Sequence, residues 1–291
     1  MSAVARRWAG ARRYRYPIAL FAPACLVLFG VSLAPSIYAL YLSFVKVGAR
    51  SDTFVGLGNF ARLASDSQFW DSLRTTALFV GGAVGAELVL GFGLALLLNH
   101  EIPGKGLLQV AAVLPMATTP IVVALAWRLM YNSAFGIFNY VLSLVHVPAQ
   151  GWLGDSTLAL PAVMIVDIWE WTPFLGFILL SGLQSLPREP MEAARVDGAS
   201  DLQILRWVTI PQLSRVFRIA IALRLIDSVK TFDILYGMTG GGPGTATETT
   251  NLYAFMVGFQ WADLGYAAAI AVVLLFMVSA VTMLLLRPAR E

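Results

Sequence analysis

The 291-residue sequence contains little charge and very little cysteine or histidine. Charged residues make up 13% of the chain and hydrophobic residues 58%, whereas soluble domains carry about a quarter charged residues. The single cysteine, Cys25, excludes an internal disulfide and a thiolate metal site. His100 and His146 are lone residues in predicted loops and do not suggest a metal site. The scarcity of charge argues against a soluble domain and indicates a membrane protein.

The sequence also lacks a nucleotide-binding motif. No GxxxxGKS or GxxxxGKT run occurs, since Gly104-Lys105-Gly106 lacks the spacing and Gly240-Gly241-Gly242 lacks the lysine. We therefore expect no cofactor and no metal in this chain. The net charge of +3 does not point to nucleic acid, because the arginines cluster at the ends of apolar segments, as topology signals do.

Long apolar segments are the dominant positive feature. A bilayer core about 30 Å thick is spanned by about 20 mostly apolar residues in a helix. Six segments qualify: 17–45, 72–99, 107–131, 157–184, 216–238 and 264–286. The fifth is the weakest, because four charged residues interrupt it. The sequence predicts an all-α, polytopic membrane protein with six transmembrane helices, of which the first is a retained anchor rather than a cleaved signal.

The distribution of lysine and arginine predicts the orientation of these segments. Loops 132–156 and 239–263 contain neither residue, whereas the loop 185–215 contains several: Arg188, Arg195, Arg206 and Arg215. Positive loops stay in the cytoplasm, so we expect a cytoplasmic tail at 1–16, a second one at 287–291, and a cytoplasmic loop at 185–215. Arg50 and Arg62, in the first outer loop, depart from this pattern.

The loop 185–215 has the signals of a helical hairpin. Pro190 suits the first turn of a helix over 191–196, and Asp197-Gly198 is a strong turn dipeptide because glycine takes a positive φ without penalty. Ser200 is placed to cap a second helix, and we expect Pro211 to end it. The spacing puts Leu202, Leu205 and Val208 on one apolar face.

Two interpretations of this hairpin remain open. It could lie on the lipid headgroups as an interfacial helix. A sharp turn and an exposed Glu192 instead favour docking into the groove of a partner protein.

Three short runs in the loop resemble a known motif: Glu192-Ala193-Ala194, Asp197-Gly198-Ala199 and Ile210-Pro211. They are similar to the EAA loop of the permeases of binding-protein-dependent ABC importers. That pattern is EAA, three residues, Gly, nine residues, Ile, one residue and Leu-Pro. In this sequence Val208 replaces the isoleucine and Ile210 replaces the leucine.

The resemblance extends over nearly the whole chain. The runs that carry it are Phe54–Phe60, Leu114-Pro115, Pro120, Gly136–Asn139, Trp169, Pro173-Phe174, Gly182-Leu183, Phe232-Asp233 and Thr239–Pro243. The last run looks like the maltose-permease-like member of the sugar-importer branch. The sequence lacks the large inserted extracytoplasmic domain of some relatives, so the role of that part is not carried over.

This resemblance implies a type I importer permease in a prokaryotic cytoplasmic membrane, itself without catalytic activity. It implies several partners: a second homologous permease subunit, two ATPase subunits that bind ATP and Mg, an extracytoplasmic solute-binding protein, membrane lipid and a sugar-like substrate. The residues implied in coupling to the ATPase are Glu192, Ala193, Ala194, Asp197, Gly198, Ala199, Ile210 and Pro211.

Charged and aromatic residues inside the predicted spans are candidates for the solute path. They are Asp167, Trp169, Glu170 and Trp171 in the fourth span, and Arg224, Asp227 and Lys230 in the fifth. Charges at bilayer depth are costly and usually face a cavity or a partner. The alternative is internal pairing, of Glu170 with Arg224 or Lys230, which would only hold helices together. Glu87 lies in the centre of the second span.

Two other functions compete with an ATP-driven importer. A gradient-driven secondary transporter or channel could use the intramembrane Asp and Glu residues, although no convincing internal repeat is present. An intramembrane enzyme is remote, because neither a Ser/His/Asp set nor an HExxH motif occurs.

Overall fold

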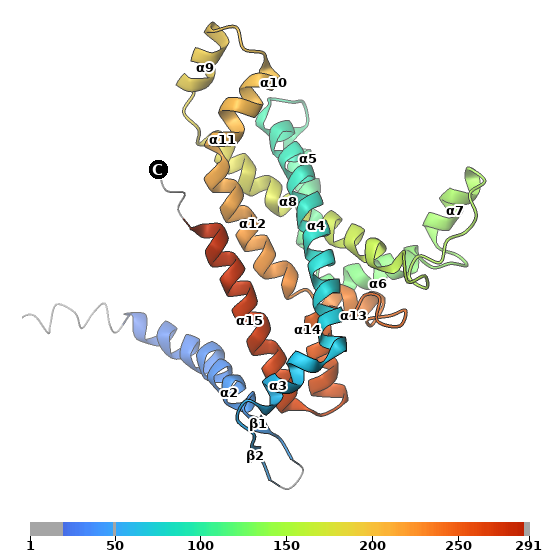
Figure 1. Ribbon diagram of the computed structural model, residues 1–291. Helices are drawn as coiled ribbons and strands as arrows, with labels where there is room; N and C mark the ends of the chain where they lie inside the picture. Colours follow the sequence, from blue (N-terminus) through green and yellow to red (C-terminus); the bar gives the residue numbers. More distant parts are fainter. Residues whose placement is uncertain (1–19, 49–50, 288–291) are drawn as a thin grey trace, which may run out of the picture. The chain divides into compact units, whose positions relative to one another are not determined.

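The computed structural model describes residues 20–48 and 51–287 (Figure 1). The predicted cytoplasmic tail 1–16, Arg50 and most of the tail 287–291 therefore lie outside the described residues. Within them the chain is helical apart from one two-stranded antiparallel hairpin, in which β1 (Val45–Lys46) pairs with β2 (Thr53–Phe54). The predicted all-α class is confirmed.

The chain forms two compact units. The first combines Met1–Ser65 with Val257–Val272. It contains a helix over Leu20–Leu42, which includes the π-helical turn η1 (Phe29–Leu33) and α2 (Ala34–Leu42), then β1, β2 and α3 (Gly58–Ser65). It also contains the first part of α15 (Leu264–Leu286) and most of the π-helical turn η3 (Met256–Gln260).

Side chains of α3 hold the first unit together. The buried amide of Asn59 donates to the carbonyl oxygens of Ser43 at 2.9 Å and Val45 at 3.1 Å. Arg62 pairs with Asp263 at 2.6 Å and lies over the ring of Tyr266. This local partner explains one of the two arginines that depart from the charge pattern of the outer loops.

The second unit combines Asp66–Met256 with Val273–Glu291. Its elements are α4 (Ser67–Asn99), α5 (Lys105–Met116), α6 (Pro120–Met130), α7 (Ile137–Leu144), α8 (Ala159–Gln184), α9 (Glu189–Val196), α10 (Asp201–Ile204), the π-helical turn η2 (Leu205–Thr209), α11 (Ile210–Gln212), α12 (Ser214–Val229), α13 (Asp233–Met238), α14 (Thr250–Phe255) and the end of α15.

The long helices α4 and α8 pack side by side and form the centre of this unit. They approach closely at two glycines: a Cβ on Gly91 would lie 3.0 Å from the backbone nitrogen of Gly176 and 3.1 Å from the carbonyl oxygen of Thr172. Small residues allow helix backbones in a membrane to approach in this way. The crossing therefore depends on the absence of both side chains.

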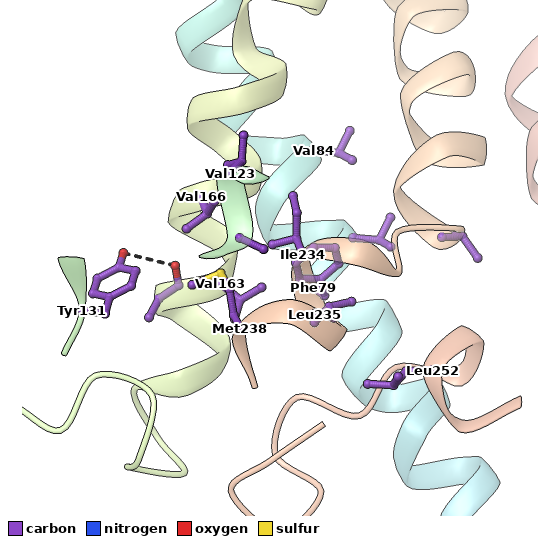
Figure 2. Close-up of a cluster of buried hydrophobic side chains, with 14 residues drawn as sticks. Phe79, Val84, Val123, Tyr131, Val163, Val166, Ile234, Leu235, Met238 and Leu252 are labelled. Carbon is purple, nitrogen blue, oxygen red and sulfur yellow. Dashed lines mark hydrogen bonds between the residues drawn. The ribbon is translucent and has the colours of Figure 1, made fainter. Parts of the chain in front are cut away.

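Two apolar clusters flank this crossing. The larger one joins α4, α6, α8 and α13 (Figure 2), and its fully buried members include Phe79, Val163 and Leu235. At its edge, the Tyr131 hydroxyl donates to the carbonyl oxygen of Ala162 at 3.2 Å. The second cluster lies toward the hairpin end of α8 and contains Leu179 and Leu213.

The described residues contain four helices that are long and apolar enough to cross a bilayer: Leu20–Leu42, α4, α8 and α15. The predicted third span consists of α5 and α6, which are bent by 93° at the break between them, and together they bring the number to five. The predicted fifth span is divided between α12 and α13, and neither helix qualifies. Six spans and cytoplasmic termini remain predictions.

Candidate functional site

The loop 185–215 folds as a helix–turn–helix, as predicted. The first helix, α9, has Pro190 in its first turn and ends at Asp197. Gly198 follows with φ +82°, its N–H bonds the carbonyl of Arg195, and the N–H of Ala199 bonds the carbonyl of Ala194. This pair of bonds is the Schellman motif, which requires a left-handed residue after the helix end. Glycine is the residue that takes this conformation without penalty.

A capping box begins the second helix. The Ser200 hydroxyl accepts from the Gln203 backbone N–H, and the Gln203 side chain accepts from the Ser200 N–H at 2.7 Å. Two N–H groups at the helix start are thereby satisfied. The turn is therefore fixed at both ends by short-range bonds, and the angle between α9 and α10 is defined by the backbone.

The apolar residues of the second helix differ in burial. Leu202 is 73% exposed, whereas Ile204 and Thr209 are buried. The π-helical turn η2 follows Ile204 and places more residues in a turn than an α-helix does, so regular α-helical spacing does not hold through Thr209. The helix also does not end at Pro211, which instead lies in the first turn of α11. In η2 the Ile210 N–H bonds the carbonyl of Leu205, so the helical path continues despite the N–H that proline lacks.

The outer surface of the hairpin combines apolar and charged side chains. Val196 is 88% exposed and Trp207 is 69% exposed. Glu192 lies at a cleft of about 500 Å³ that is lined from α9 and from the ends of α4 and α8, with Arg188, Arg195 and Glu101 among its residues. The hairpin thus exposes both large apolar side chains and charged ones.

The base of the hairpin is joined to the long helices. Leu213, between α11 and α12, is fully buried and packs in the cluster with Leu98 of α4 and Leu179 of α8. A Cβ on Gly182 of α8 would lie 2.9 Å from the side chain of Val216 on α12. A displacement of the hairpin would therefore be transmitted to α4, α8 and α12 through close-packed side chains.

A buried charge cluster joins the same three helices farther along. Arg224 of α12 is fully buried and donates to both carboxylate oxygens of Glu87 on α4, at 2.7 and 3.0 Å. It also pairs with Asp167 of α8 and, at 3.4 Å, with Asp227. The Trp171 ring lies 5.1 Å from the guanidinium. Arg224 thus links α4, α8 and α12 through charge-assisted hydrogen bonds.

The alternative pairing of Glu170 with Arg224 or Lys230 does not appear. Arg224 is occupied by Glu87 and Asp167, and Lys230 lies 3.9 Å from Asp227. Glu87 was recognised in the sequence as a central charge but was not assigned a partner. The candidates divide by burial: Asp167, Glu170 and Arg224 are buried. Trp169, Asp227 and Lys230 are at least partly exposed.

The loop after α13 is a bonded structure rather than a flexible connector. The Thr247 hydroxyl lies 2.6 Å from that of Thr239 and donates to the carbonyl of Gly242. Glu248 accepts from Gln68 at 2.9 Å. Burial raises the pKa of the Glu248 carboxyl above its ordinary value of 4.5, the Gln68 donor opposes this, and Asp66 adds to the rise. Nearby, α4, the start of α8 and this loop line a cavity of about 590 Å³.

The sequence of this chain matches one protein family over most of its length. Residues 87–289 match the model of the binding-protein-dependent transport system inner membrane component. The chain belongs to this family and is a multi-pass inner-membrane permease component of an ABC transport system. Its part in such a system is translocation rather than catalysis.

Characterised relatives cover most of the chain. It is 40% identical over 237 residues to the trehalose/maltose transport system permease protein MalF of Thermococcus litoralis, covering 81% of this chain and 80% of the relative. It is 31% identical to the sulfoquinovosyl glycerol transport system permease protein SmoG of Agrobacterium fabrum, and the match covers 98% of this chain and 93% of the relative. It is 30% identical to the trehalose transport system permease protein SugA of Mycobacterium tuberculosis, covering 94% and 88%.

The fold is shared with solved ABC transporters. A chain of a bacterial alginate ABC transporter, solved in complex with a pentasaccharide-bound periplasmic protein, aligns with a TM-score of 0.83 at 20% identity, and 96% of each chain is covered. A chain of a bacterial ABC transporter that imports alginate gives the same TM-score at 21% identity, covering 98% of this chain and all of the other. These likenesses establish the type I importer permease fold.

Proposed function

We propose that this chain is a permease subunit of an ATP-driven importer of a sugar or sugar-like solute. An extracytoplasmic binding protein delivers the solute, a second permease subunit completes the pathway, and two ATPase subunits bind ATP and Mg. The hairpin α9–α10 docks into a cleft of one ATPase, and closure of the ATPase pair moves the helices between inward-open and outward-open states.

The observation that carries this proposal is the construction of the hairpin. Its turn is fixed by a Schellman motif and a capping box, its outer surface exposes Val196 and Trp207, and its base is held in the core at Leu213. A lever needs a rigid arm, an exposed contact surface and a packed connection to the part that moves. The hairpin has each of these.

The sugar class rests on the relatives, whose names specify trehalose, maltose and sulfoquinovosyl glycerol. On this chain, Trp169 of α8 exposes an aromatic face, and Asp227 and Lys230 of the predicted fifth span expose hydrogen-bonding groups. Trp169 lines an apolar groove of about 700 Å³ with Trp127. We propose these exposed candidates as the solute contacts, whereas the buried ones act within the subunit.

Cysteine crosslinking tests the docking of the hairpin. In a Cys25→Ser background, Val196→Cys should crosslink to a co-expressed ATPase subunit, because Val196 is almost fully exposed on α9. Tyr140→Cys is the matched control: it is 60% exposed on α7, in the loop expected outside the cell. It should give no crosslink to the ATPase.

The same preparation tests the assembly. Co-purification should yield this chain with a second permease and two ATPase subunits, and reconstituted transport should require ATP. Transport by this chain alone, or an assembled complex in which V196C and Y140C crosslink equally, would refute the proposal.

A further inference from the structure

Glu170 is a buried carboxylate whose present surroundings do not explain it. The residue is 1% exposed, and neither of its oxygens accepts a hydrogen bond from any described residue. A buried ionisable group without a partner is costly, so such groups in native proteins require an explanation. One is that the partner arrives in another conformation.

Arg224 binds the neighbouring carboxylate on the same helix, Asp167. Asp167 precedes Glu170 by three residues on α8, so the two carboxylates lie on neighbouring turns of one helix face. Both are buried, and Asp167 binds the Arg224 guanidinium. A displacement of α12 along α8 by three residues, about 4.5 Å, would bring Arg224 from one carboxylate to the other.

Two features of α8 favour such a movement. Pro173, inside the helix and three residues beyond Glu170, cannot donate the backbone hydrogen bond that would normally stiffen this turn. The next turn contains Gly176, whose contact with Gly91 of α4 is made largely by backbone. A helix that lacks one backbone hydrogen bond next to a close helix contact bends at that turn more readily than elsewhere.

We infer that Glu170 is a positioning residue for transport, the second acceptor of Arg224, which exchanges Asp167 for Glu170 as α12 moves along α8 in the transport cycle. This inference rests on the proposed alternating access. Glu87 accepts from Arg224 in the present state, and the inference requires its side chain to follow the guanidinium, so that Arg224 is not left without a carboxylate during the exchange.

State-specific stability of the assembled transporter tests the exchange. Melting temperatures are measured without nucleotide and after trapping with ATP and vanadate. Glu170→Gln should lower the melting temperature in one of these states, and Asp167→Asn should lower it in the other. Because a hydrogen bond to a charged group changes an equilibrium by about tenfold or more, E170Q should slow ATP-driven transport by about tenfold.

Two variants separate the exchange from a general packing defect. Glu87→Gln should lower the melting temperature in both states. Thr172→Val is the matched control, because the Thr172 hydroxyl is also buried on α8 and has no hydrogen-bond partner among the described residues. T172V should leave the melting temperature unchanged in both states. If E170Q behaves like T172V, or lowers both states equally, the inference is wrong.

A distance measurement covers the case in which E170Q does not assemble. In the Cys25→Ser background, spin labels at Ile165 of α8 and Leu223 of α12, which are 47% and 48% exposed, report the position of one helix along the other. Their separation should change between the two states by several ångströms, and an unchanged separation refutes the exchange. A complex that lacks ATP-driven transport altogether contradicts the proposed function instead.

Discussion

Removing the cation of the buried cluster should destabilise the chain severely. Arg224→Met keeps an unbranched stem but removes the guanidinium, and it leaves Glu87 and Asp167 fully buried without their cation. Breaking a buried ion pair by removing one partner costs about 3–5 kcal/mol, because the other charge stays uncompensated. Since 1.36 kcal/mol is a factor of ten, the ratio of folded to unfolded chain should fall by a factor on the order of 10² to 10³.

The assay is thermal stability of the detergent-solubilised complex, followed by the fraction that remains in a monodisperse size-exclusion peak after heating. In a domain of this size, a loss of 1 kcal/mol in the free energy of unfolding lowers the melting temperature by about 2–4 °C. R224M should therefore lower the midpoint of thermal unfolding by about 6 °C or more. Arg128→Met is the matched control, because Arg128 donates one bond to the carbonyl of Gly237, at 3.2 Å, and leaves no carboxylate behind. Its midpoint should fall by only a few degrees.

Neutralising the whole cluster should restore much of the loss. In Glu87→Gln, Asp167→Asn, Arg224→Met the three helices keep similar side-chain volumes and the two carboxylates that lost their cation are neutral, and replacing a buried ion pair by neutral groups is often close to neutral. If R224M melts like wild type, or if the triple variant melts no higher than R224M alone, the assigned role of Arg224 as the bond between these helices is wrong.

Three further predictions concern the hairpin, the helix crossing and the outer loop. Gly198→Val should abolish transport and reduce recovery of the ATPase on co-purification, because φ +82° costs a side chain about 1–2 kcal/mol even though no described atom lies near the added Cβ. Gly91→Leu should lower the yield of folded chain by overpacking against Gly176, costing about 1–3 kcal/mol. Glu248 has a raised pKa, so it contributes stability below about pH 4.5 that is lost as the pH rises through its folded-state pKa. Glu248→Gln should therefore flatten the dependence of the melting temperature on pH above about pH 4.5, and an unchanged slope would contradict this.

Local features of the hairpin could be predicted because they depend on residues a few positions apart. Pro190, Gly198 and Ser200 act through backbone bonds within one turn, and the structure contains the expected helix start, turn and cap. The inward face of the second helix could not be predicted in the same way. Regular helical spacing puts Leu202, Leu205 and Val208 on one face but does not say which way that face points, and in the structure Leu202 is exposed whereas Ile204 and Thr209 are buried.

The partners of the intramembrane charges lay beyond sequence reasoning. Arg224 and Glu87 are 137 residues apart, and their pairing depends on the rotation of α4, α8 and α12 about their own axes. That rotation follows from side-chain packing, which includes the close contact of Gly91 with Gly176. Charge and hydropathy predict that a buried charge has a partner, but they do not select Glu87 over Glu170.

The weak apolarity of the predicted fifth span has a structural explanation in the same cluster. Hydropathy measures each residue as if it faced lipid, whereas Arg224 faces inward and is covered by α4, α8 and the Trp171 ring. Helix α12 therefore needs fewer apolar residues than a helix surrounded by lipid, because its cation is satisfied inside the protein. The same helix leaves the hairpin through Leu213. Helix α12 is therefore joined to its neighbours both at the hairpin and at Arg224, so the charges that weaken its apolar signal in the sequence are also contacts through which it acts on α4 and α8.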